Sequence, residues 1–230
     1  MRIALLEFYD IVIFHDVDEI LIADPLIYSS LADYITTNAQ KLETWKILGG
    51  VGVEIFHDAI NEVRYDPTLA VLRQRKNASF RLPGCKPAIY YSDEANTPHG
   101  TTIPFTLDVN LWLLHLKFLD QDIMLSRQPT RNAAVERGEV PNFTRWALDP
   151  TELDNELARF ISRPLDVDES RMRKFLSQNM RNVDDGCWIV DRNPVAPHKV
   201  FKAVNGLQAE AGKSLNEFRF VIPERFKEIV

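Results

Sequence analysis

Hydrophobic residues along this chain are grouped into short runs that are separated by polar and charged positions. Residues 11–14 form an unbroken apolar run with β-branched members, and a polar residue bounds it on each side. Such a run is typical of a strand that is buried on both faces, as in a parallel sheet covered by helices. We therefore predict a buried strand at residues 11–14.

The rest of the first half alternates between strand-like and helix-like patterns. The predicted elements are the end of a helix at 3–8, a helix that begins at Asp24 and Pro25, a strand pair at 44–56, a short helix at 69–75, strands at 79–82 and 87–91, and an edge strand at 101–107. Three glycines, Gly49, Gly50 and Gly52, lie inside the strand pair. We expect them to permit a bulge or the close approach of another backbone segment.

From Asp120 onward the chain is more charged, and apolar residues recur at helical spacing. We predict helices at residues 121–139, 151–161 and 169–179. The last forty or so residues are expected to wrap around the domain rather than fold alone. The predicted organisation is an α/β core at residues 1–120 and a helical C-terminal extension at residues 121–230 that packs on this core.

Composition narrows the class of protein. Hydrophobic residues make up 45% of the 230 residues and charged residues 26%, which is ordinary for a soluble globular protein. A net charge of -6 argues against a broad surface for nucleic acid or anionic membrane. No apolar run approaches the roughly 20 residues that span a bilayer. Cys85 and Cys187 lack metal-type spacing, so we expect reduced thiols and a cytoplasmic location.

Acidic residues follow the first apolar run directly, at Asp16, Asp18 and Glu19. Asp16 and Asp18 are two positions apart, so in an extended backbone their side chains share a face. Open α/β sheets bind ligands at the carboxyl edge of their strands. Two neighbouring carboxylates repel each other unless a cation lies between them, and Mg²⁺ or Mn²⁺ that carries phosphate oxygens suits such hard donors. The alternative is that these acids cap a helix or end a turn.

Five short segments carry a resemblance to a known family. They read Ile-Val-Ile-Phe-His-Asp-Val-Asp-Glu-Ile-Leu at 11–21, Gly-Gly-Val-Gly at 49–52, Cys-Lys-Pro-Ala at 85–88, Pro-His-Gly at 98–100 and Leu-Leu-His-Leu-Lys at 113–117. In this order they resemble the D-x-D-E, K-P, H-G and L-H-x-K segments of the family-2-like glycosyltransferases. The resemblance covers roughly residues 9–120. It implies a GT-A-like, Rossmann-related mixed sheet flanked by helices, with a helical C-terminal portion.

The same resemblance implies a nucleotide-binding segment ahead of the acidic motif. This chain has only about a helix's worth of residues there, so most of the base and ribose pocket is expected to be missing. The resemblance assigns Asp16 and Asp18 as ligands of a divalent cation and of the donor's diphosphate. It assigns His99 as a further metal ligand and Lys86 as a phosphate contact. His115 lies in an apolar stretch and is interpreted as a core histidine.

An inverting transfer needs a carboxylate that deprotonates the acceptor hydroxyl. Glu54, Asp93, Glu94 and Asp108 are candidates, and we prefer Asp93 and Glu94 because they lie in a polar loop. The predicted function is metal-dependent transfer of a sugar from a nucleotide-diphosphate sugar to a glycan or other hydroxyl acceptor. The basic residues Arg73, Arg75 and Lys76 are interpreted as a solvated helix end rather than a diphosphate clamp.

Two other functions remain open from the sequence. A haloacid-dehalogenase-like phosphatase also begins with a strand that ends in Asp-x-Asp, where the first aspartate is the nucleophile. Here Glu19 and Ile20 stand where that family has Gly and Thr, and Asp184 with Asp185 could supply its late acidic pair. The third hypothesis is a catalytically impaired remnant or binding module of the transferase fold.

Tryptophans and strand edges bear on that third hypothesis. Trp112, Trp146 and Trp188 could line a sugar or partner surface, although a buried tryptophan is usually part of the core. A sheet edge left open by missing strands would favour pairing with a second copy of the chain. A homo-oligomer is therefore among the expected partners, whereas nucleic acid is not.

Overall fold

The computed structural model describes residues 2–81, 84–92, 96–97, 100–101, 103–139, 149–190 and 217–229. Four residues that the sequence singled out lie outside these ranges, namely Asp93, Glu94, His99 and Trp146. Their predicted roles stay predictions.

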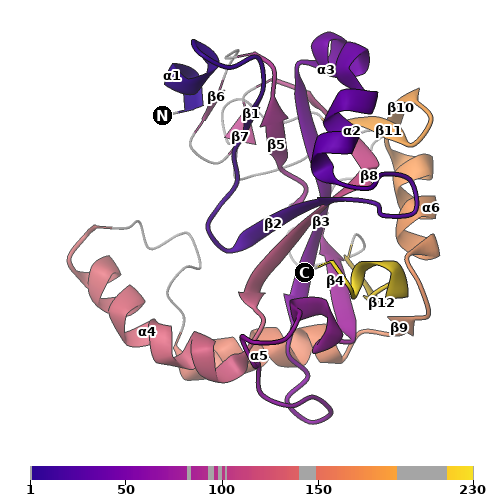
Figure 1. Cartoon of the computed structure of the whole chain (residues 1–230). Coiled ribbons are helices and arrows are strands. Elements are labelled where there is room, and N and C mark those ends of the chain that lie inside the picture. Colours follow the sequence, from indigo (N-terminus) through magenta and orange to yellow (C-terminus); the bar gives the residue numbers. More distant parts are fainter. Residues whose placement is uncertain are drawn as a thin grey trace.

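The described chain contains both strands and helices, with consecutive strands through its middle and the longer helices after them (Figure 1). In order they are α1 (Arg2–Leu6), β1 (Val12–Ile13), β2 (Glu19–Ala23), α2 (Leu31–Thr37), α3 (Ala39–Trp45), β3 (Ile47–Phe56), the 3₁₀ turn η1 (Val71–Arg73), β4 (Asn77–Arg81), β5 (Pro87–Tyr90), β6 (Asn96–Thr97), β7 (Gly100–Thr101), β8 (Phe105–Phe118), α4 (Gln121–Glu136), α5 (Pro150–Ile161), β9 (Leu165–Asp166), α6 (Ser170–Asn179), β10 (Arg181–Asp184), β11 (Cys187–Val190), β12 (Glu217–Val221) and the 3₁₀ turn η5 (Glu224–Phe226). Two of the described strands, β6 and β7, form a separate hairpin.

The described strands form a ten-stranded mixed sheet in which β3 and β8 are the long central pair. These two strands run parallel, whereas β1, β2, β4, β5 and β11 each pair antiparallel with a neighbour. Strands β11 and β12 come from the second half of the chain and join the same sheet. The predicted α/β class with a mixed sheet flanked by helices is therefore confirmed.

Strand β8 is longer than the sequence pattern predicts. It has 14 residues, most of them buried, and it joins the expected edge strand at 101–107 to the apolar stretch that follows. Its first half pairs with β11, from Phe105 to Asp108, and its second half pairs with β2, from Leu111 to His115. The expectation of an edge strand was wrong, because β3 lies along one side of β8 while β11 and β2 share the other.

The prediction of a buried parallel strand at residues 11–14 was also wrong. Strand β1 has only two residues, and it pairs antiparallel with β5. Ile13 is 39% exposed, whereas Ile11 and Phe14 pack against different hydrophobic clusters. A run of four apolar residues does not show whether its members share one environment, and here they do not.

The segment after β2 forms a turn where the sequence predicts the start of a helix. Helix α2 begins only at Leu31, and the Ser30 side chain caps it by accepting from the Asp33 N–H group. The Asp24 carboxylate instead accepts from the Leu26 N–H group and pairs with Arg225 near the C-terminal end. This long-range ion pair is invisible in the local pattern.

Arg75 is likewise not part of a solvated helix end. It is fully buried, and it donates hydrogen bonds to the carbonyl oxygens of Leu119 and Val63. Arg73 does lie at the surface, where it pairs with Glu228. Buried arginine is tolerated here because backbone oxygens replace its lost water.

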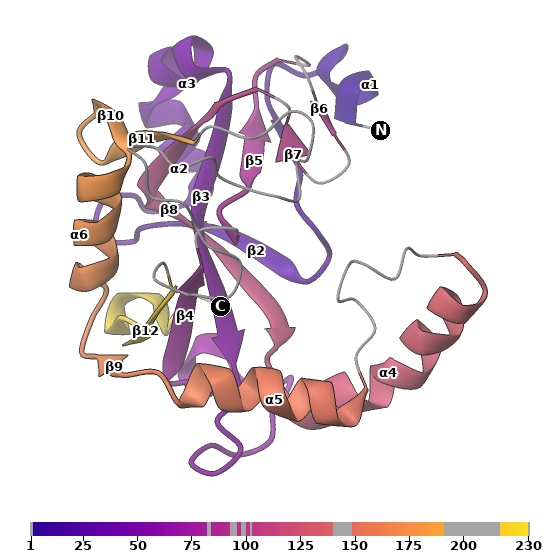
Figure 2. The ribbon, with the colours of Figure 1, turned by 180° about the vertical axis from the view of Figure 1, so that it is seen from behind.

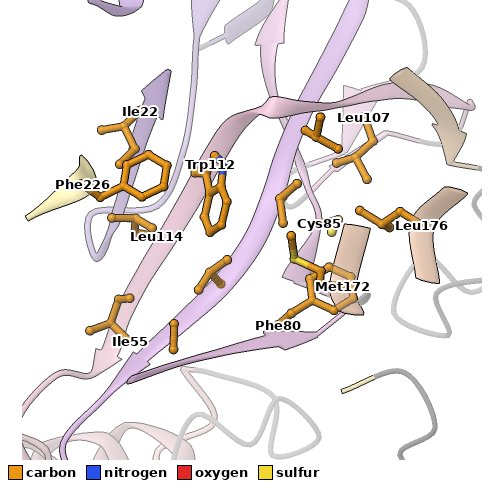
Figure 3. Close-up of a cluster of buried hydrophobic side chains, with 14 of the residues drawn as sticks. Ile22, Ile55, Phe80, Cys85, Leu107, Trp112, Leu114, Met172, Leu176 and Phe226 are labelled. Carbon is orange, nitrogen blue, oxygen red and sulfur yellow. The ribbon is translucent and has the colours of Figure 1, made fainter. Parts of the chain in front are cut away.

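The main core lies on one face of the central strands, and Figure 3 shows part of it. Trp112 is 1% exposed, and its ring packs against Phe220 and Phe226 from the C-terminal segment. The described part of the C-terminal segment, residues 217–229, thus packs on the core, as predicted for the end of the chain. Trp112 belongs to the core and not to a sugar-binding surface, and Trp188 is also buried in this cluster.

Helices α4, α5 and α6 confirm the three helices that the second half of the sequence predicts. Helix α5 begins with a capping box formed by Asp149 and Glu152, and it packs Leu157 and Phe160 under the ends of β3 and β8 (Figure 2). None of the described helices is long and apolar enough to cross a membrane.

Candidate functional site

The acidic motif lies in a tight turn between β1 and β2. The Asp16 N–H group donates to Glu19 Oε2 at 3.0 Å, and the Asp16 carbonyl oxygen accepts from the Glu19 N–H group at 3.0 Å. Val17 is fully exposed at the tip of the turn. These bonds fix the turn, so that Asp16, Asp18 and Glu19 are presented beside the start of β2.

Strand pairing places Glu19, His115 and Glu54 in one row across three neighbouring strands. Glu19 on β2 is the register partner of His115 on β8, and Glu54 on β3 is the register partner of His115 on its other side. Residues that are directly opposite across a sheet project from the same face. The row therefore carries two carboxylates with one imidazole between them.

Lys86 reaches the same place because two glycines let its segment pass close over β3. A Cβ atom on Gly52 would lie 2.1 Å from the Gly84 carbonyl carbon, and one on Gly49 would lie 2.4 Å from the Lys86 carbonyl oxygen. The Gly52 N–H group also donates to Cys85 Sγ at 3.3 Å. The predicted close backbone approach at these glycines is confirmed.

Lys86 forms ion pairs with two residues of the acidic motif. Its Nζ atom lies 2.8 Å from Asp16 Oδ2 and 2.5 Å from Glu19 Oε1. Burial by itself lowers the pKa of Lys86, but the negative charges of Glu19 and Asp16 outweigh burial and raise it. Lys86 is therefore a charged partner of the acidic motif. Its predicted contact with phosphate stays a prediction.

His115 lies between two carboxylates. Its Nε2 atom is 3.4 Å from Asp18 Oδ2, and its Nδ1 atom is 2.9 Å from Glu54 Oε1. Burial lowers the pKa of His115, but the hydrogen bonds to Asp18 and Glu54 outweigh it and raise the pKa to about 10. The hydrogen bond from His115 in turn lowers the pKa of Asp18 to about 2. His115 is thus a histidine with both ring nitrogens paired, as the core interpretation expects, but its side chain is partly exposed rather than fully buried.

A pocket of about 210 Å³ opens beside this group of side chains. It is lined by Glu19, Gly52, Val53, Glu54, Gly84, Lys86 and His115. Glu54 is 8% exposed, and its Oε2 atom is buried without a hydrogen-bond partner among the described residues. We call Asp16, Asp18, Glu19, Glu54, Lys86 and His115 the acidic cluster.

Sequence reasoning placed Asp16, Asp18 and Lys86 in the site, and the structure brings these three together. It did not assign Glu19 or His115, and it preferred other residues to Glu54. The signal for Glu19 was present in the motif itself, one position after Asp18. Glu54 and His115 are 61 positions apart, so only the pairing of β3 with β8 reveals their contact.

The carboxylates of the motif suit a hard divalent cation. Asp16 and Asp18 are partly exposed, and Mg²⁺ sites commonly use one or two carboxylates together with phosphate oxygens and water. Within the described ranges, no group of three or more His, Cys, Asp or Glu side chains could hold a metal ion by itself. The predicted divalent cation at Asp16 and Asp18 stays a prediction.

The other acidic candidates lie elsewhere. Asp108 accepts a hydrogen bond from the Tyr34 hydroxyl at 2.7 Å, so it is bound up in a separate buried contact. Asp184 pairs with Lys41 at the surface, and Asp185 lines a different cavity. The late acidic pair that a phosphatase of the haloacid dehalogenase type would need is therefore not part of the acidic cluster.

No protein-family model, no curated protein and no solved structure matches this chain. The resemblance to the family-2-like glycosyltransferases therefore rests on the sequence motifs alone. A functional interpretation has to start from the geometry of the acidic cluster and its pocket.

Proposed function

We propose that this chain is a divalent-cation-dependent glycosyltransferase that takes a sugar from a nucleotide-diphosphate sugar and gives it to a glycan or other hydroxyl acceptor with inversion. The observation that carries this proposal is the acidic cluster, in which four carboxylates and two cationic side chains meet beside one pocket. A group of charged side chains beside a pocket is a candidate functional site.

The charge balance of the acidic cluster favours a cationic ligand. Four carboxylates outnumber the two cations Lys86 and His115, so the cluster keeps an excess of negative charge. Asp16 and Asp18 are the residues that would hold Mn²⁺ or Mg²⁺. Such a cation, when bound, neutralises negative charge that develops on the departing nucleoside diphosphate.

Lys86 is suited to exchange one partner for another. Its ammonium group already lies within ion-pair distance of two carboxylates, and the segment that carries it passes directly over β3. A phosphate oxygen of the donor can replace a carboxylate oxygen without any change in the charge of Lys86. Lys86 would thus orient the diphosphate against Asp16.

Helix α4 supplies a further positive charge near Asp18. Burial and the neighbouring Arg127 lower the pKa of Arg131, whereas the negative charge of Asp18 acts in the opposite direction. Arg131 therefore lies within electrostatic reach of the acidic motif. Arg131 thus partly offsets the negative charge of the acidic cluster, which reduces its repulsion of a ligand's diphosphate.

The test is calorimetric titration of UDP and of GDP, with and without Mn²⁺, into the wild type and Asp18→Asn. We expect binding that requires Mn²⁺ and that weakens by at least about 100-fold in the variant, since a charge-assisted ligand is removed. Asp185→Asn, which changes an exposed acid outside the acidic cluster, is the matched control and should bind as the wild type does.

Three results would change the interpretation. Absence of nucleotide binding by the wild type, with or without Mn²⁺, contradicts a transferase. Binding of UDP without release of sugar from any donor favours a binding module of this fold. Metal-dependent hydrolysis of p-nitrophenyl phosphate that is lost in Asp16→Asn would instead favour a phosphatase with Asp16 as its nucleophile.

A further inference from the structure

We propose that Glu54 is the catalytic base that deprotonates the acceptor hydroxyl, and that the pocket beside it receives that hydroxyl. This inference rests on the proposed transferase function and names the residue that completes it. It replaces our sequence-based preference for Asp93 and Glu94 with a residue whose surroundings the structure describes.

The two oxygens of Glu54 have different surroundings. His115 Nδ1 holds Oε1 at 2.9 Å, whereas Oε2 is buried and has no hydrogen-bond partner among the described residues. An unpaired buried carboxylate oxygen is costly, because folding has removed its water without a replacement. A hydroxyl group of a ligand in the pocket would satisfy this atom. The contact with His115 fixes the carboxylate so that Oε2 stays available.

The pocket has room at Glu54 because its neighbours are small. Gly52 lies two positions before Glu54 on β3, and Gly84 packs against Gly52. Both line the pocket of about 210 Å³, and neither contributes a side chain to it. Glu19, Lys86 and His115 add polar atoms to the lining. A ligand that carries a hydroxyl group can donate to Glu54 Oε2, whereas an apolar ligand would leave this atom unpaired.

Glu54 and Asp18 contact different ring nitrogens of His115. The imidazole contacts Asp18 through Nε2 and Glu54 through Nδ1, so one ring separates the two carboxylates. Inversion requires that the acceptor oxygen approach the anomeric carbon from the side opposite the departing diphosphate. The contacts of His115 give separate positions to a diphosphate at Asp18 and a hydroxyl at Glu54.

The proposed step transfers one proton and one glycosyl group. The acceptor O–H bond breaks and its proton passes to Glu54 Oε2, while the acceptor oxygen forms a bond to the anomeric carbon of the donor. The bond between that carbon and the diphosphate oxygen breaks, and the nucleoside diphosphate leaves with the electron pair. Glu54 then returns its proton to solvent. No oxidant, reductant or further reactant is needed.

Other described carboxylates are less suited to this step. Glu19 Oε2 accepts from the Asp16 N–H group, and Glu19 Oε1, although it also has no hydrogen-bond partner among the described residues, lies 2.5 Å from the ammonium group of Lys86. Asp108 is bound to Tyr34 and does not line the pocket. Asp16 and Asp18 are the residues assigned to the cation. Glu54 is the carboxylate of the acidic cluster that combines a fixed oxygen with an unpaired one.

The experiment compares the wild type, Glu54→Gln and Glu54→Ala, with Glu43→Gln on the exposed surface of α3 as the matched control. UDP binding with Mn²⁺ is measured by calorimetry. Turnover is measured as release of UDP or GDP from UDP-glucose, UDP-galactose, UDP-N-acetylglucosamine and GDP-mannose, with water, glycerol and free monosaccharides as acceptors. Formate is added to Glu54→Ala, since a small carboxylate can occupy the space of the missing side chain.

We expect Glu54→Gln to bind UDP within about threefold of the wild type and to lose turnover by about 10²- to 10⁴-fold, the usual contribution of a general base. Formate should restore part of the turnover of Glu54→Ala, which a merely structural role would not produce. Wild-type turnover in Glu54→Gln, or UDP binding without turnover in the wild type, would overturn the assignment of Glu54. Failure of the wild type to bind UDP or GDP would overturn the transferase itself.

Discussion

The two halves of strand β8 each carry a group of polar side chains, and these groups differ in how completely their atoms are paired. In the first half, Asp108 is 3% exposed and accepts from the Tyr34 hydroxyl at 2.7 Å and from the Asn110 N–H group at 2.8 Å. In the second half, His115 lies among carboxylates beside a pocket, and Glu54 keeps an unpaired oxygen.

The charges of the two groups differ as well. Burial raises the pKa of Asp108, although its hydrogen bonds act in the opposite direction, and burial together with Asp108 raises the pKa of the Cys187 thiol to about 12. In the acidic cluster, by contrast, His115 holds the pKa of Asp18 at about 2. Buried polar groups with full sets of partners stabilise a fold, whereas charged groups kept partly unpaired beside a pocket indicate a ligand.

The largest loss of stability is expected from a substitution at Gly52, where the segment that carries Lys86 passes close over β3. Gly52→Ala would place a Cβ atom 2.1 Å from the Gly84 carbonyl carbon, so backbone must move. We expect a loss of about 3 kcal/mol in the free energy of unfolding, together with weaker UDP binding. Urea unfolding and calorimetry measure the two effects.

Gly50→Ala is the control for this substitution. Its nearest contact would be 3.1 Å, to the Leu111 carbonyl oxygen, so a smaller shift relieves it. We expect a smaller loss of stability and little change in UDP binding. If the two substitutions reduced stability and UDP binding equally, the position of Lys86 would not depend on the packing of Gly52 against Gly84.

The next effect separates binding from stability. Lys86→Ala removes the ion pairs with Asp16 and Glu19 and the proposed phosphate contact. We expect Mn²⁺-dependent UDP affinity to fall by about 10- to 100-fold, as for loss of one charge-assisted hydrogen bond. Lys41→Ala, which removes a surface ion pair with Asp184 near Asp108, should leave affinity unchanged. Calorimetry measures the UDP affinity of Lys86→Ala and Lys41→Ala. A loss in Lys86→Ala alone would show that the ligand binds beside the second half of β8 and not beside the first.

Tyr34→Phe is expected to change the stability of the protein but not its affinity for UDP. Tyr34→Phe removes the hydroxyl that pairs with buried Asp108, so we expect the free energy of unfolding to fall by about 2 kcal/mol. UDP binding should be unchanged, because neither residue lines the pocket of the acidic cluster. A variant that unfolds like the wild type but binds UDP poorly would contradict the structural role of Asp108.

The smallest effect is a dependence on alkaline pH. The folded pKa of Cys187, about 12, is raised above its ordinary value of 9.0. Its contribution to stability is therefore complete below pH 9 and is lost as the pH rises toward 12. Between pH 8 and pH 10 we expect the wild type to lose about 1 kcal/mol more than Cys187→Ala does. Parallel pH profiles from urea unfolding would contradict a buried neutral thiol.

The sequence by itself determined the parts of this protein that depend on neighbouring residues. Apolar residues at helical spacing identified α4, α5 and α6, and short strand-like runs identified β4 and β5. The pair Asp16 and Asp18 and the glycines at positions 49 and 52 were visible as local motifs. Each of these features is set by spacing within a few positions, which a single sequence displays directly.

Only the tertiary structure decided which motifs meet. The register of β8 against β2 and β3 places His115 between Glu19 and Glu54, and it leaves Asp108, in the first half of the same strand, in a different contact. The tertiary structure also decided that β1 is a short strand, which among the described strands pairs only with β5. Strand register is fixed by packing between segments far apart in the chain, so no local pattern encodes it.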